Sequence, residues 1–335
     1  SLTTHPNVGG VLLVGLGCEG LKAPALAETV VASGRWCERL LIQESGGTQS
    51  SILKGIDAVN AGLKAIAQSE RVPMRWDELV VGTICGGSDA FSGISANPAI
   101  GRAFDRLIEG GATCIFEETG ELVGCDDIII PRAANDAVAT ALAESLERAA
   151  VYYNAMGVPS FSPGNATGGL TTIEEKSMGA YCKSGSSKIV GVIAPATIPP
   201  APGLYLMDVV PLGEPKFGFP NINDSAEILE MIASGAHAIL FSTGRGSVVG
   251  SIISPVIKLC SNSRTYAAME GDMDINAGRV ITGEASLDEL GEETVALLGK
   301  VAEGAKTKSE ALGHREAVLT YKGETVSAVT ACNAY

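Results

Sequence analysis

The chain has 335 residues, of which 46% are hydrophobic, and it carries 38 acidic against 24 basic residues, for a formal net charge of −14. This composition supports one large core or two ordinary ones and excludes a disordered chain. The negative charge disfavours partners such as nucleic acid or an anionic membrane surface. No apolar run approaches the roughly 20 residues of a membrane helix, and the first residues lack a signal-peptide pattern, so we expect a cytoplasmic protein.

The cysteines exclude two further classes of protein. The chain has eight of them, spread along its length without a C-x-x-C pair. Neither a zinc ribbon nor a small disulfide-linked scaffold has this distribution. We therefore expect most of the thiols to be reduced and several of them to be core residues.

Short apolar runs rich in β-branched residues predict strands in the first part of the chain. They are bounded by glycine or polar residues and cover residues 11–16, 40–42, 79–84 and 113–116. Between them lie helical patterns, one with apolar residues three and four apart over 52–66, and one that begins with Asn97 as its cap. Strands that alternate with helices predict a parallel sheet with helices on both faces, a Rossmann-like, three-layer α/β fold.

The rest of the chain is less regular. A helix predicted over 136–156 is followed by loops rich in glycine and proline, and a later helix begins with the capping-box pattern of Ser286 and Glu289. We predict that the chain consists of three parts. They are a parallel α/β domain over 1–133, a connecting helix and linker over 134–160, and a second, more irregular α/β half over 161–335 that completes the active site.

Thiols, carboxylates and hydroxyls follow each of the first four predicted strands. Ligands of such folds bind beyond the carboxyl ends of the strands, where loops and helix N-termini converge, so this edge of the sheet is the predicted functional site. The alternative is a set of glycines and small polar caps that only turn the chain. The residues after the strands are Gly17-Cys18-Glu19, Glu44-Ser45-Gly46-Gly47-Thr48, Cys85-Gly86-Gly87-Ser88-Asp89 and Glu117-Glu118.

Two thiols at this edge suggest a metal site. If the strands before Cys18 and Cys85 are neighbours, the pair could bind a thiophilic divalent ion such as iron, with Glu19, Glu44 or Asp89 close by. The alternative is that each cysteine is a small buried residue that fills a tight turn. Both interpretations are open at this point.

The first turn also matches a different class of site. Residues 15–20 read G-x-G-x-x-G between a predicted strand and a predicted helix, and Glu44 ends the next strand, where a dinucleotide-binding protein has its ribose-binding acid. A nicotinamide-dependent oxidoreductase is therefore an alternative. Against it, the loop carries the Cys18 thiol and the Glu19 carboxylate where a pyrophosphate would approach, and two glycines after Glu44 suggest another close approach to the backbone.

Further candidates lie in the second half of the chain. In the segment 162–184, Asn165 and Thr167 could form hydrogen bonds to a substrate, and Lys176 or Glu175 could transfer a proton. The alternative there is a capped helix whose acidic first turn suits its dipole. Arg245 stands in a glycine-flanked loop, where its guanidinium could hold a carboxylate through two hydrogen bonds, although arginine is also common in exposed turns.

Six segments between residue 5 and about residue 285 resemble the catalytic region of the altronate dehydratase and D-galactarate dehydratase family, whose relatives include the large subunit of sulfolactate sulfo-lyase. They are "HPNVGGVLLVGLGCE", "ESGGT", "CGGSDAFSGISANPAIG", "SPGNATGGLTTIEEKSMG", "ASGAHAILFSTGRGS" and "GDMDINAGR". The resemblance implies a cytoplasmic lyase that removes water, or sulfite in one branch, from a hydroxylated carboxylic acid. It also implies a divalent metal, iron(II) or alternatively manganese or magnesium, and no NAD.

The resemblance also bears on partners. Family members of the sugar-acid type carry a small all-β domain, fused or as a separate subunit, that does not occur in this sequence. We therefore expect such a domain or subunit as a partner, besides a small-molecule hydroxycarboxylate as substrate, and an oligomeric assembly. The expected substrate is a sugar acid of the altronate or galactarate type, with sulfolactate as the alternative and the NAD-dependent oxidoreductase as a more distant one.

The implied reaction begins with loss of the proton α to a carboxylate. That proton is only weakly acidic until the charge of the developing enediolate is neutralised, which a metal at the strand ends could do. We predict Lys176, Glu175 and Asp89 as catalytic residues, and Cys18, Glu19, Cys85 and Glu44 as metal ligands. The predicted substrate-binding residues are Gly86, Gly87, Ser88, Asn165, Thr167, Thr243 and Arg245.

Overall fold

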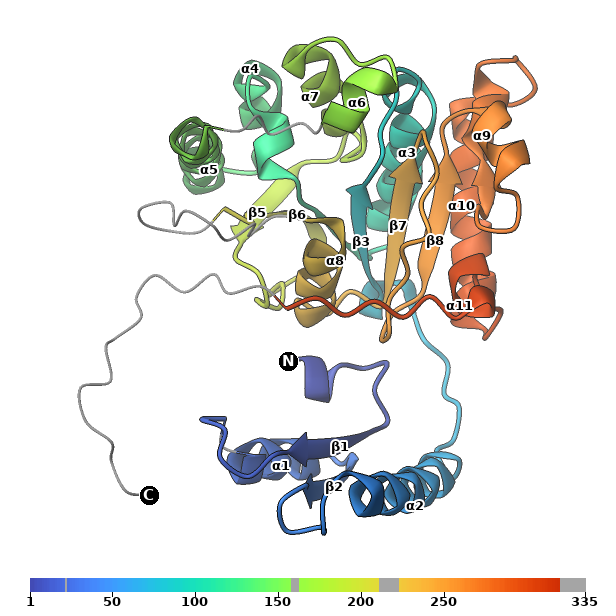
Figure 1. The fold of residues 1–335 in the computed structure, drawn as a ribbon. Helices are drawn as coiled ribbons and strands as arrows, with labels where there is room; N and C mark the ends of the chain where they lie inside the picture. Colours follow the sequence, from blue (N-terminus) through green and yellow to red (C-terminus); the bar gives the residue numbers. More distant parts are fainter. Residues whose placement is uncertain (22, 158–162, 211–222, 320–335) are drawn as a thin grey trace. The chain divides into compact units, whose positions relative to one another are not determined.

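The computed structural model describes residues 1–21, 23–157, 163–210 and 223–319 (Figure 1). The chain divides into two compact units, residues 1–75 and 76–335. Each unit combines parallel strands with helices, which confirms the predicted α/β class. No helix in the described part of the chain is both long and apolar enough to cross a membrane.

The first unit is built around two strands. In chain order it contains η1 (Leu2–Thr4), β1 (Gly10–Gly15), α1 (Ala23–Ala32), β2 (Trp36–Leu41) and α2 (Thr48–Ile66). β1 and β2 are parallel and pair over their whole length, and they form a sheet of their own.

α2 packs on this sheet through small residues. Ala58 and Gly62 are buried, and a Cβ on Gly62 would stand 2.7 Å from the ring of Trp36. The large apolar residues of the predicted stripe are exposed instead, Ile52 by 56% and Leu63 by 58%. The sequence pattern therefore located the helix but not the face that packs on the sheet of its own unit.

The second unit is built on a seven-stranded parallel sheet with the order β5-β6-β4-β3-β7-β8-β9. The strands are β3 (Val80–Cys85), β4 (Thr113–Phe116), β5 (Ile189–Ile193), β6 (Gly203–Met207), β7 (Ala238–Thr243), β8 (Val256–Cys260) and β9 (Ile275–Asn276). The α-helices are α3 (Ala96–Glu109), α4 (Asp126–Ile129), α5 (Asp136–Met156), α6 (Pro163–Thr167), α7 (Ile173–Cys182), α8 (Asp224–Ala233), α9 (Ser263–Ala268), α10 (Leu287–Ala302) and α11 (Lys308–Leu312). The 3-10 turns are η2 (Trp76–Glu78), η3 (Ser92–Ile94), η4 (Thr119–Leu122), η5 (Ile130–Arg132) and η6 (Ala277–Val280).

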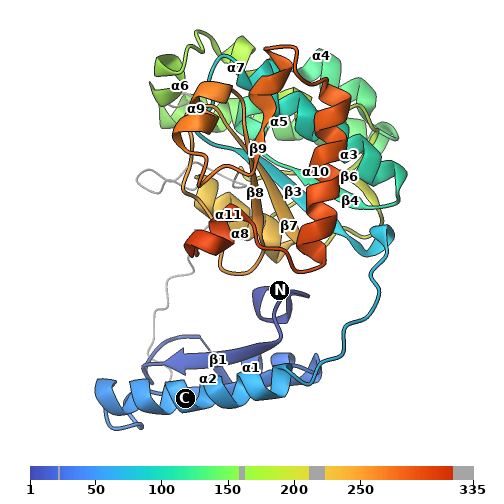
Figure 2. The same cartoon turned by 90° about the vertical axis from the view of Figure 1, so that its right-hand side faces the viewer.

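Helices cover both faces of this sheet. Val81 of β3 belongs to one core cluster with Ile100 of α3 and Leu290 of α10. Gly82 follows it and therefore faces the other side, where a Cβ would stand 2.7 Å from the sulfur of Met231 in α8. Figure 1 accordingly shows α3 and α8 on opposite sides of β3, and Figure 2 shows α10 running beside α3.

Two helices begin where capping side chains predict. α5 coincides with the predicted helix over 136–156, and the side chain of Asn135 caps it by accepting a hydrogen bond from the Val138 amide at 3.0 Å. Both hydrogen bonds of the predicted capping box of α10 are present, between Ser286 and Glu289. Polar caps are local, so they can be recognised without the rest of the fold.

Asn97 is an exception, because the residue at the cap of α3 is Ser95. The Asn97 side chain is used across the fold instead. It accepts a hydrogen bond from the Ser242 hydroxyl at 2.6 Å and donates one to the Gly179 carbonyl at 2.9 Å. It therefore links α3 to the end of β7 and to α7.

The predicted division at residues 133 and 160 differs from the two units of the structure. β3 and β4, from the predicted first domain, pair with β7 and β6, from the predicted second half. The helix predicted as a connector, α5, buries Leu142 and Leu146 in the core of the second unit. The observed units are therefore 1–75 and 76–335.

Candidate active site at the ends of β3 and β4

β3 and β7 are neighbours in the centre of the large sheet, and the chain leaves them in opposite directions. After β3 it continues to β4 on one side, and after β7 it continues to β8 and β9 on the other. In open parallel sheets this change of direction leaves a crevice beyond the carboxyl ends of the strands, which is where ligands bind. Cys85 is the last residue of β3 and therefore stands at this position.

Cys85 lies in a cluster with two carboxylates. Glu118, two residues after β4, accepts hydrogen bonds at its Oε1 atom from the Cys85 amide at 3.1 Å and from the Cys85 thiol at 2.9 Å. Glu121, in η4, has its Oε2 atom 3.5 Å from the same sulfur. The cluster forms because β3 and β4 pair in the sheet, so the segments that follow them start side by side.

Two buried lysines balance the charge of these carboxylates. The Nζ atom of Lys176 in α7 lies 2.8 Å from Glu121 Oε2, 3.0 Å from Cys85 Sγ and 3.0 Å from the Ser88 hydroxyl. Lys183, directly after α7, forms an ion pair with Glu118. The side chains of the lysines are only 3% and 2% exposed, so neither charge is solvated by bulk water.

The surroundings shift the protonation of two groups in opposite senses. Burial alone would lower the pKa of Lys176, but the Cys85 thiol and the Glu121 carboxylate next to Nζ outweigh it and raise the pKa above its ordinary value. Burial and the Glu227 carboxylate raise the pKa of Glu117 well above its usual range, although Lys183 acts against them. Both shifts favour the protonated forms, which are the Lys176 ammonium and the Glu117 carboxylic acid.

The backbone at Glu118 has an unusual conformation. Its φ of 71° lies in the left-handed region, which a residue other than glycine adopts at a cost of roughly 1–3 kcal/mol. The conformation turns the chain from β4 into η4, and thereby brings Glu118 and Glu121 to the same sulfur. Strain of this kind is typical of functional sites.

A fourth carboxylate lies next to Gly86. Asp224 is the first residue of α8, and its Oδ2 atom is only 2.0 Å from the position of a Cβ on Gly86. Although part of the residue faces solvent, crowding by protein and the nearby Glu121 carboxylate raise the pKa of Asp224 from 3.8 to about 6, against the effect of Lys176 and Lys183. Only glycine at position 86 leaves room for this carboxylate.

The other predicted residues of the loop after β3 line the cluster or support it. The Ser88 hydroxyl lies 3.1 Å from the Cys85 sulfur, and the Ser88 carbonyl accepts a hydrogen bond from Asn165 at 3.2 Å. Gly87 is exposed, has a φ of 62° and accepts hydrogen bonds at its carbonyl from the amides of residues 244 and 245. Ser88 and Asn165 are therefore at the site, and Gly87 links it to the loop after β7.

Asp89, predicted as a catalytic residue, holds loops together in this structure. Its buried carboxylate accepts hydrogen bonds from the hydroxyls of Ser92 at 2.9 Å and Ser261 at 2.7 Å, and from the Asn262 amide group at 2.9 Å. These partners come from the loops after β3 and β8. Three hydrogen bonds from two loops thus hold this carboxylate in place, which favours a structural role.

Glu175, Thr167, Thr243 and Arg245 lie outside the cluster contacts. Glu175 is exposed and accepts hydrogen bonds from Thr171, just before α7. This contact agrees with the alternative interpretation of this segment, a capped helix with an acidic first turn. Thr167 is exposed, and buried Thr243 accepts a hydrogen bond from the residue 246 amide at 3.1 Å. The exposed Arg245 donates to the carbonyl of residue 164 at 2.8 Å. Arg245 therefore contacts α6, the short helix that contains Asn165.

Cys18, Glu19 and Glu44 belong to the first unit, whereas Cys85 belongs to the second. The strands before Cys18 and at Cys85 lie in different sheets, which corrects the prediction that the two thiols end neighbouring strands. Cys18 is exposed, and Glu19 accepts hydrogen bonds at its carboxylate from the amides of Gly17 at 2.7 Å and Cys18 at 3.1 Å. These amide contacts lower the pKa of Glu19.

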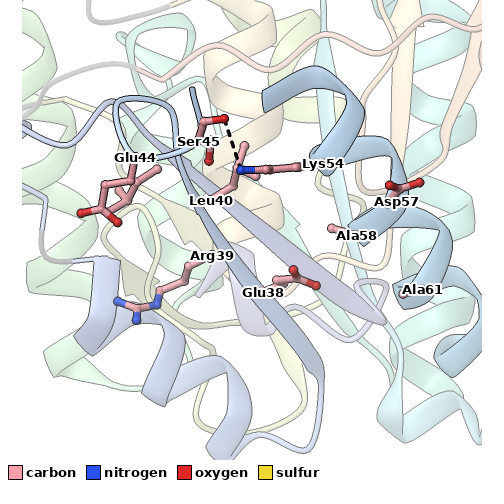
Figure 3. A pocket seen from close by; sticks show the side chains of 10 residues that line it. Glu38, Arg39, Leu40, Glu44, Ser45, Lys54, Asp57, Ala58 and Ala61 are labelled. Atoms are coloured by element: carbon pink, nitrogen blue, oxygen red, sulfur yellow. Dashed lines mark hydrogen bonds between the residues drawn. The ribbon is translucent and has the colours of Figure 1, made fainter. Parts of the chain in front are cut away.

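Glu44 lines a pocket of the first unit, shown in Figure 3. The pocket lies between β2 and α2 and has a volume of about 650 Å³. Lys54 crosses it and donates a hydrogen bond to the Ser45 carbonyl at 3.2 Å. Within its own unit, Glu44 therefore lies beside Ser45 and Lys54.

Among the described residues, one group of acidic, cysteine or histidine side chains could hold a metal ion, and it is the Cys85 cluster. Its three ligand atoms, from Cys85, Glu118 and Glu121, lie within 4.8 Å of one another. A sulfur and two carboxylate oxygens are suitable ligands for a divalent first-row metal. The donor set therefore fits the implied metal, with Cys85 as the one residue in common with the predicted ligands.

Sequence reasoning missed Glu121, Lys183 and Asp224. Glu118 was noted as a polar residue after a strand, but it was not assigned a role. Glu121 follows it by three residues in a helical turn, and this spacing was a signal that could have found it. Lys183 and Asp224 carry no local signal, because only the folded chain brings them to β3 and β4.

Comparison with known protein families accounts for both units. Residues 76–325 match the family described as D-galactarate/altronate dehydratase, C-terminal, and residues 1–67 match D-galactarate dehydratase/altronate hydrolase, second domain. The chain therefore belongs to the D-galactarate/altronate dehydratase family, which confirms the resemblance found in the sequence segments. The match over residues 76–325 begins at residue 76, which is also the first residue of the second structural unit.

Individual relatives have the names of lyases. The chain is 35% identical to (2R)-sulfolactate sulfo-lyase subunit beta of Chromohalobacter salexigens over 94% of its own length and 79% of the relative's. It is 32% identical to altronate dehydratase of Escherichia coli, over 97% of this chain and 63% of the relative. It is 35% identical to galactarate dehydratase (L-threo-forming) of the same organism, over 91% of this chain and 58% of the relative. The chain thus spans less than two thirds of the two dehydratases. The predicted class, a lyase, is confirmed at the level of the family.

Proposed function

We propose that this chain catalyses the elimination of water from a hydroxylated sugar acid of the altronate or galactarate type, with a divalent metal at the Cys85 cluster. The observation that carries the proposal is the meeting of Cys85, Glu118 and Glu121 with the Lys176 ammonium at the carboxyl ends of β3 and β4. The names of the two dehydratase relatives suggest the substrate class.

Cys85, Glu118 and Glu121 would hold the metal. A bound divalent ion would supply positive charge that stabilises the enediolate formed when the α-proton is lost. A thiol ligand together with carboxylates favours a first-row ion such as iron(II), with manganese as the harder alternative. Lys183 has a supporting role, because its ion pair with Glu118 holds that carboxylate in place.

Lys176 is the proposed proton donor at this site. Its ammonium lies beside the Glu121 carboxylate and the Cys85 sulfur, where it can stabilise negative charge and can give a proton to the departing β-hydroxyl, which then leaves as water. The Ser88 hydroxyl and the Cys85 sulfur orient Nζ by direct contact. This role refines the prediction of Lys176 as a proton-transfer residue, and it disfavours Glu175, whose carboxylate accepts two hydrogen bonds from Thr171.

Two features of the chain bear on the alternatives to this function. The glycine loop after β1 is poorly suited to a dinucleotide, because Glu19 already engages the amides of Gly17 and Cys18 that would face a pyrophosphate. A sulfo-lyase remains the second candidate, because the relative of that name is matched over 79% of its length. That relative is a subunit, which supports a partner subunit for this chain as well.

The test is metal analysis together with a substrate screen. The full chain is loaded with iron(II) or manganese and given altronate, galactarate or sulfolactate, and 2-keto product and sulfite are measured. Cys85→Ser is expected to lose bound metal and turnover together. Cys260→Ser is the matched control, because Cys260 is also a buried cysteine at the end of a strand of the same sheet.

The outcomes separate the candidates. Formation of 2-keto product from a sugar acid supports the dehydratase, and sulfite from sulfolactate supports the second candidate. Full metal content and turnover in Cys85→Ser would contradict the proposed metal site. No turnover of the three compounds by the wild type, alone and with a small-domain subunit added, would contradict the proposed function.

A further inference from the structure

The proposed reaction needs a proton acceptor that the Cys85 cluster does not contain. Glu118 and Glu121 are paired with Lys183 and Lys176, two buried lysines. Glu117 is buried, and its carboxylate accepts a hydrogen bond from the Glu118 amide. The acceptor must therefore be a further group that reaches the crevice.

The carboxylates around the crevice are nearly all engaged. Asp89 accepts hydrogen bonds from two loops, and Asp208, after β6, forms an ion pair with Arg148 of α5. Glu175 caps α7. Within the described ranges of the chain, Asp224 takes part in no ion pair, although it stands among charged groups.

Asp224 has the position and the access that a proton acceptor requires. Its Oδ2 atom lies over Gly86, the residue that follows Cys85. A Cβ on Gly86 would stand only 2.0 Å from this oxygen. The residue is exposed, whereas Cys85, Ser88 and Lys176 are buried, so Asp224 is the one of these four residues that a solute reaches from solvent.

We propose that Asp224 is the catalytic base of this site and accepts the α-proton of the hydroxy acid at Oδ2. This inference rests on the proposed function. The C–H electron pair becomes the new C=C bond, and the C–O electron pair leaves with the β-hydroxyl, which takes a proton from Lys176 to give water. The resulting enol tautomerises to a 2-keto acid, Asp224 releases its proton to solvent and Lys176 takes one up.

The charge of Asp224 suits this role near neutral pH. The charged groups that face it are Glu121 from η4, Lys176 from α7 and Lys183 directly after α7. Crowding and Glu121 raise the pKa of Asp224 to about 6, so the carboxylate is ionised at pH 7 and yet more basic than an ordinary aspartate. A general base is most effective when its pKa lies near the working pH.

The test compares Asp224→Asn with Asp136→Asn in the full chain. The two residues are matched, because each is the first residue of an α-helix that an asparagine caps, and Asp136 of α5 is exposed. On the compound that the wild type converts, Asp224→Asn is expected to lower kcat by about 10²- to 10⁴-fold, with metal content and KM retained. Asp136→Asn is expected to keep the kcat of the wild type.

Two further measurements distinguish proton transfer from a structural role. With substrate deuterated at the α-carbon, the isotope effect on kcat is expected to rise in Asp224→Asn and to return toward the wild-type value in Asp224→Glu. The acidic limb of the kcat/KM profile, near pH 6 in the wild type, is expected to disappear in Asp224→Asn.

Each outcome bears on one claim. Wild-type kcat in Asp224→Asn, or loss of its metal, would contradict the role of Asp224 and leave the proposed function standing. Failure of the wild type with every compound contradicts the proposed function, and the role of Asp224 falls with it.

Discussion

The ion pair between Lys183 and Glu118 offers a direct test of how the cluster is held together. Both side chains are almost fully buried, at 2% and 6% exposure. Replacing Lys183 by methionine keeps most of the packing but leaves the Glu118 carboxylate buried without its partner. Breaking a buried pair in this way costs about 3–5 kcal/mol.

This cost is large enough to measure as a change in thermal unfolding. For a unit of this size, we expect Lys183→Met to lower the Tm by roughly 10 °C. Differential scanning calorimetry of the full chain, with a chelator present so that no metal shares the charge of Glu118, gives the value. Lys300→Met is the control, because Lys300 is exposed near the end of α10.

A second substitution separates the lost charge from lost packing. Glu118→Gln in the Lys183→Met background removes the unpaired carboxylate, so it is expected to restore most of the stability. The loss in Lys183→Met is also expected to shrink as the pH falls, because protonation of Glu118 removes the unpaired charge. A Tm within about 1 °C of the wild type, or a double variant as unstable as the single one, would refute the reasoning.

Three further expectations concern the same unit. Gly93→Ala should lower the free energy of unfolding by about 1–3 kcal/mol in a urea titration, because its Cβ would stand 2.9 Å from the Cα of Gly179 in α7. Gly299→Ala, where nothing lies within 4 Å, should raise the free energy of unfolding by about 0.5–1 kcal/mol through helix propensity, and an equal loss at both glycines would contradict this. The pKa of Asp224 in the folded chain, about 6, exceeds the ordinary value of 3.8, so its ionisation destabilises the fold as the pH rises through 6. In urea titrations Asp224→Asn should therefore gain stability relative to the wild type at about pH 7 but not at about pH 3.5, and a gain independent of pH would contradict the raised pKa of Asp224.

The sequence predicted the parts of the fold that depend on local chemistry. The strands, the long helix α5 and the capping box of α10 follow from periodicity and capping residues. The division of the strands between two sheets could not be predicted in this way, because β1, β2, β3 and β4 alternate with helices in the same manner. Only long-range pairing, such as β3 with β7, shows that β1 and β2 form a sheet of their own.

The same limit applies to the site. Cys85 and Lys176 were predicted, the first from its place at the end of a strand and the second from the family segment that contains it, and the structure brings their side chains to 3.0 Å. Cys18 was predicted from the same strand-end argument, but its strand does not neighbour that of Cys85, because β1 and β3 lie in different sheets. Asp224 could not be predicted, because its neighbour Gly86 is 138 positions away along the chain.

The hydrogen bonds of Asp89 have a consequence for motion. Its carboxylate ties the loop after β3 to the loop after β8 across the intervening strand β7. Local opening of the loop that carries Ser88 must therefore break contacts to Ser261 and Asn262 as well, which slows amide exchange with deuterium in both loops together. Such a tether keeps the Cys85 thiol and the Ser88 hydroxyl in place before any ligand arrives, so that less conformational entropy is lost when one binds.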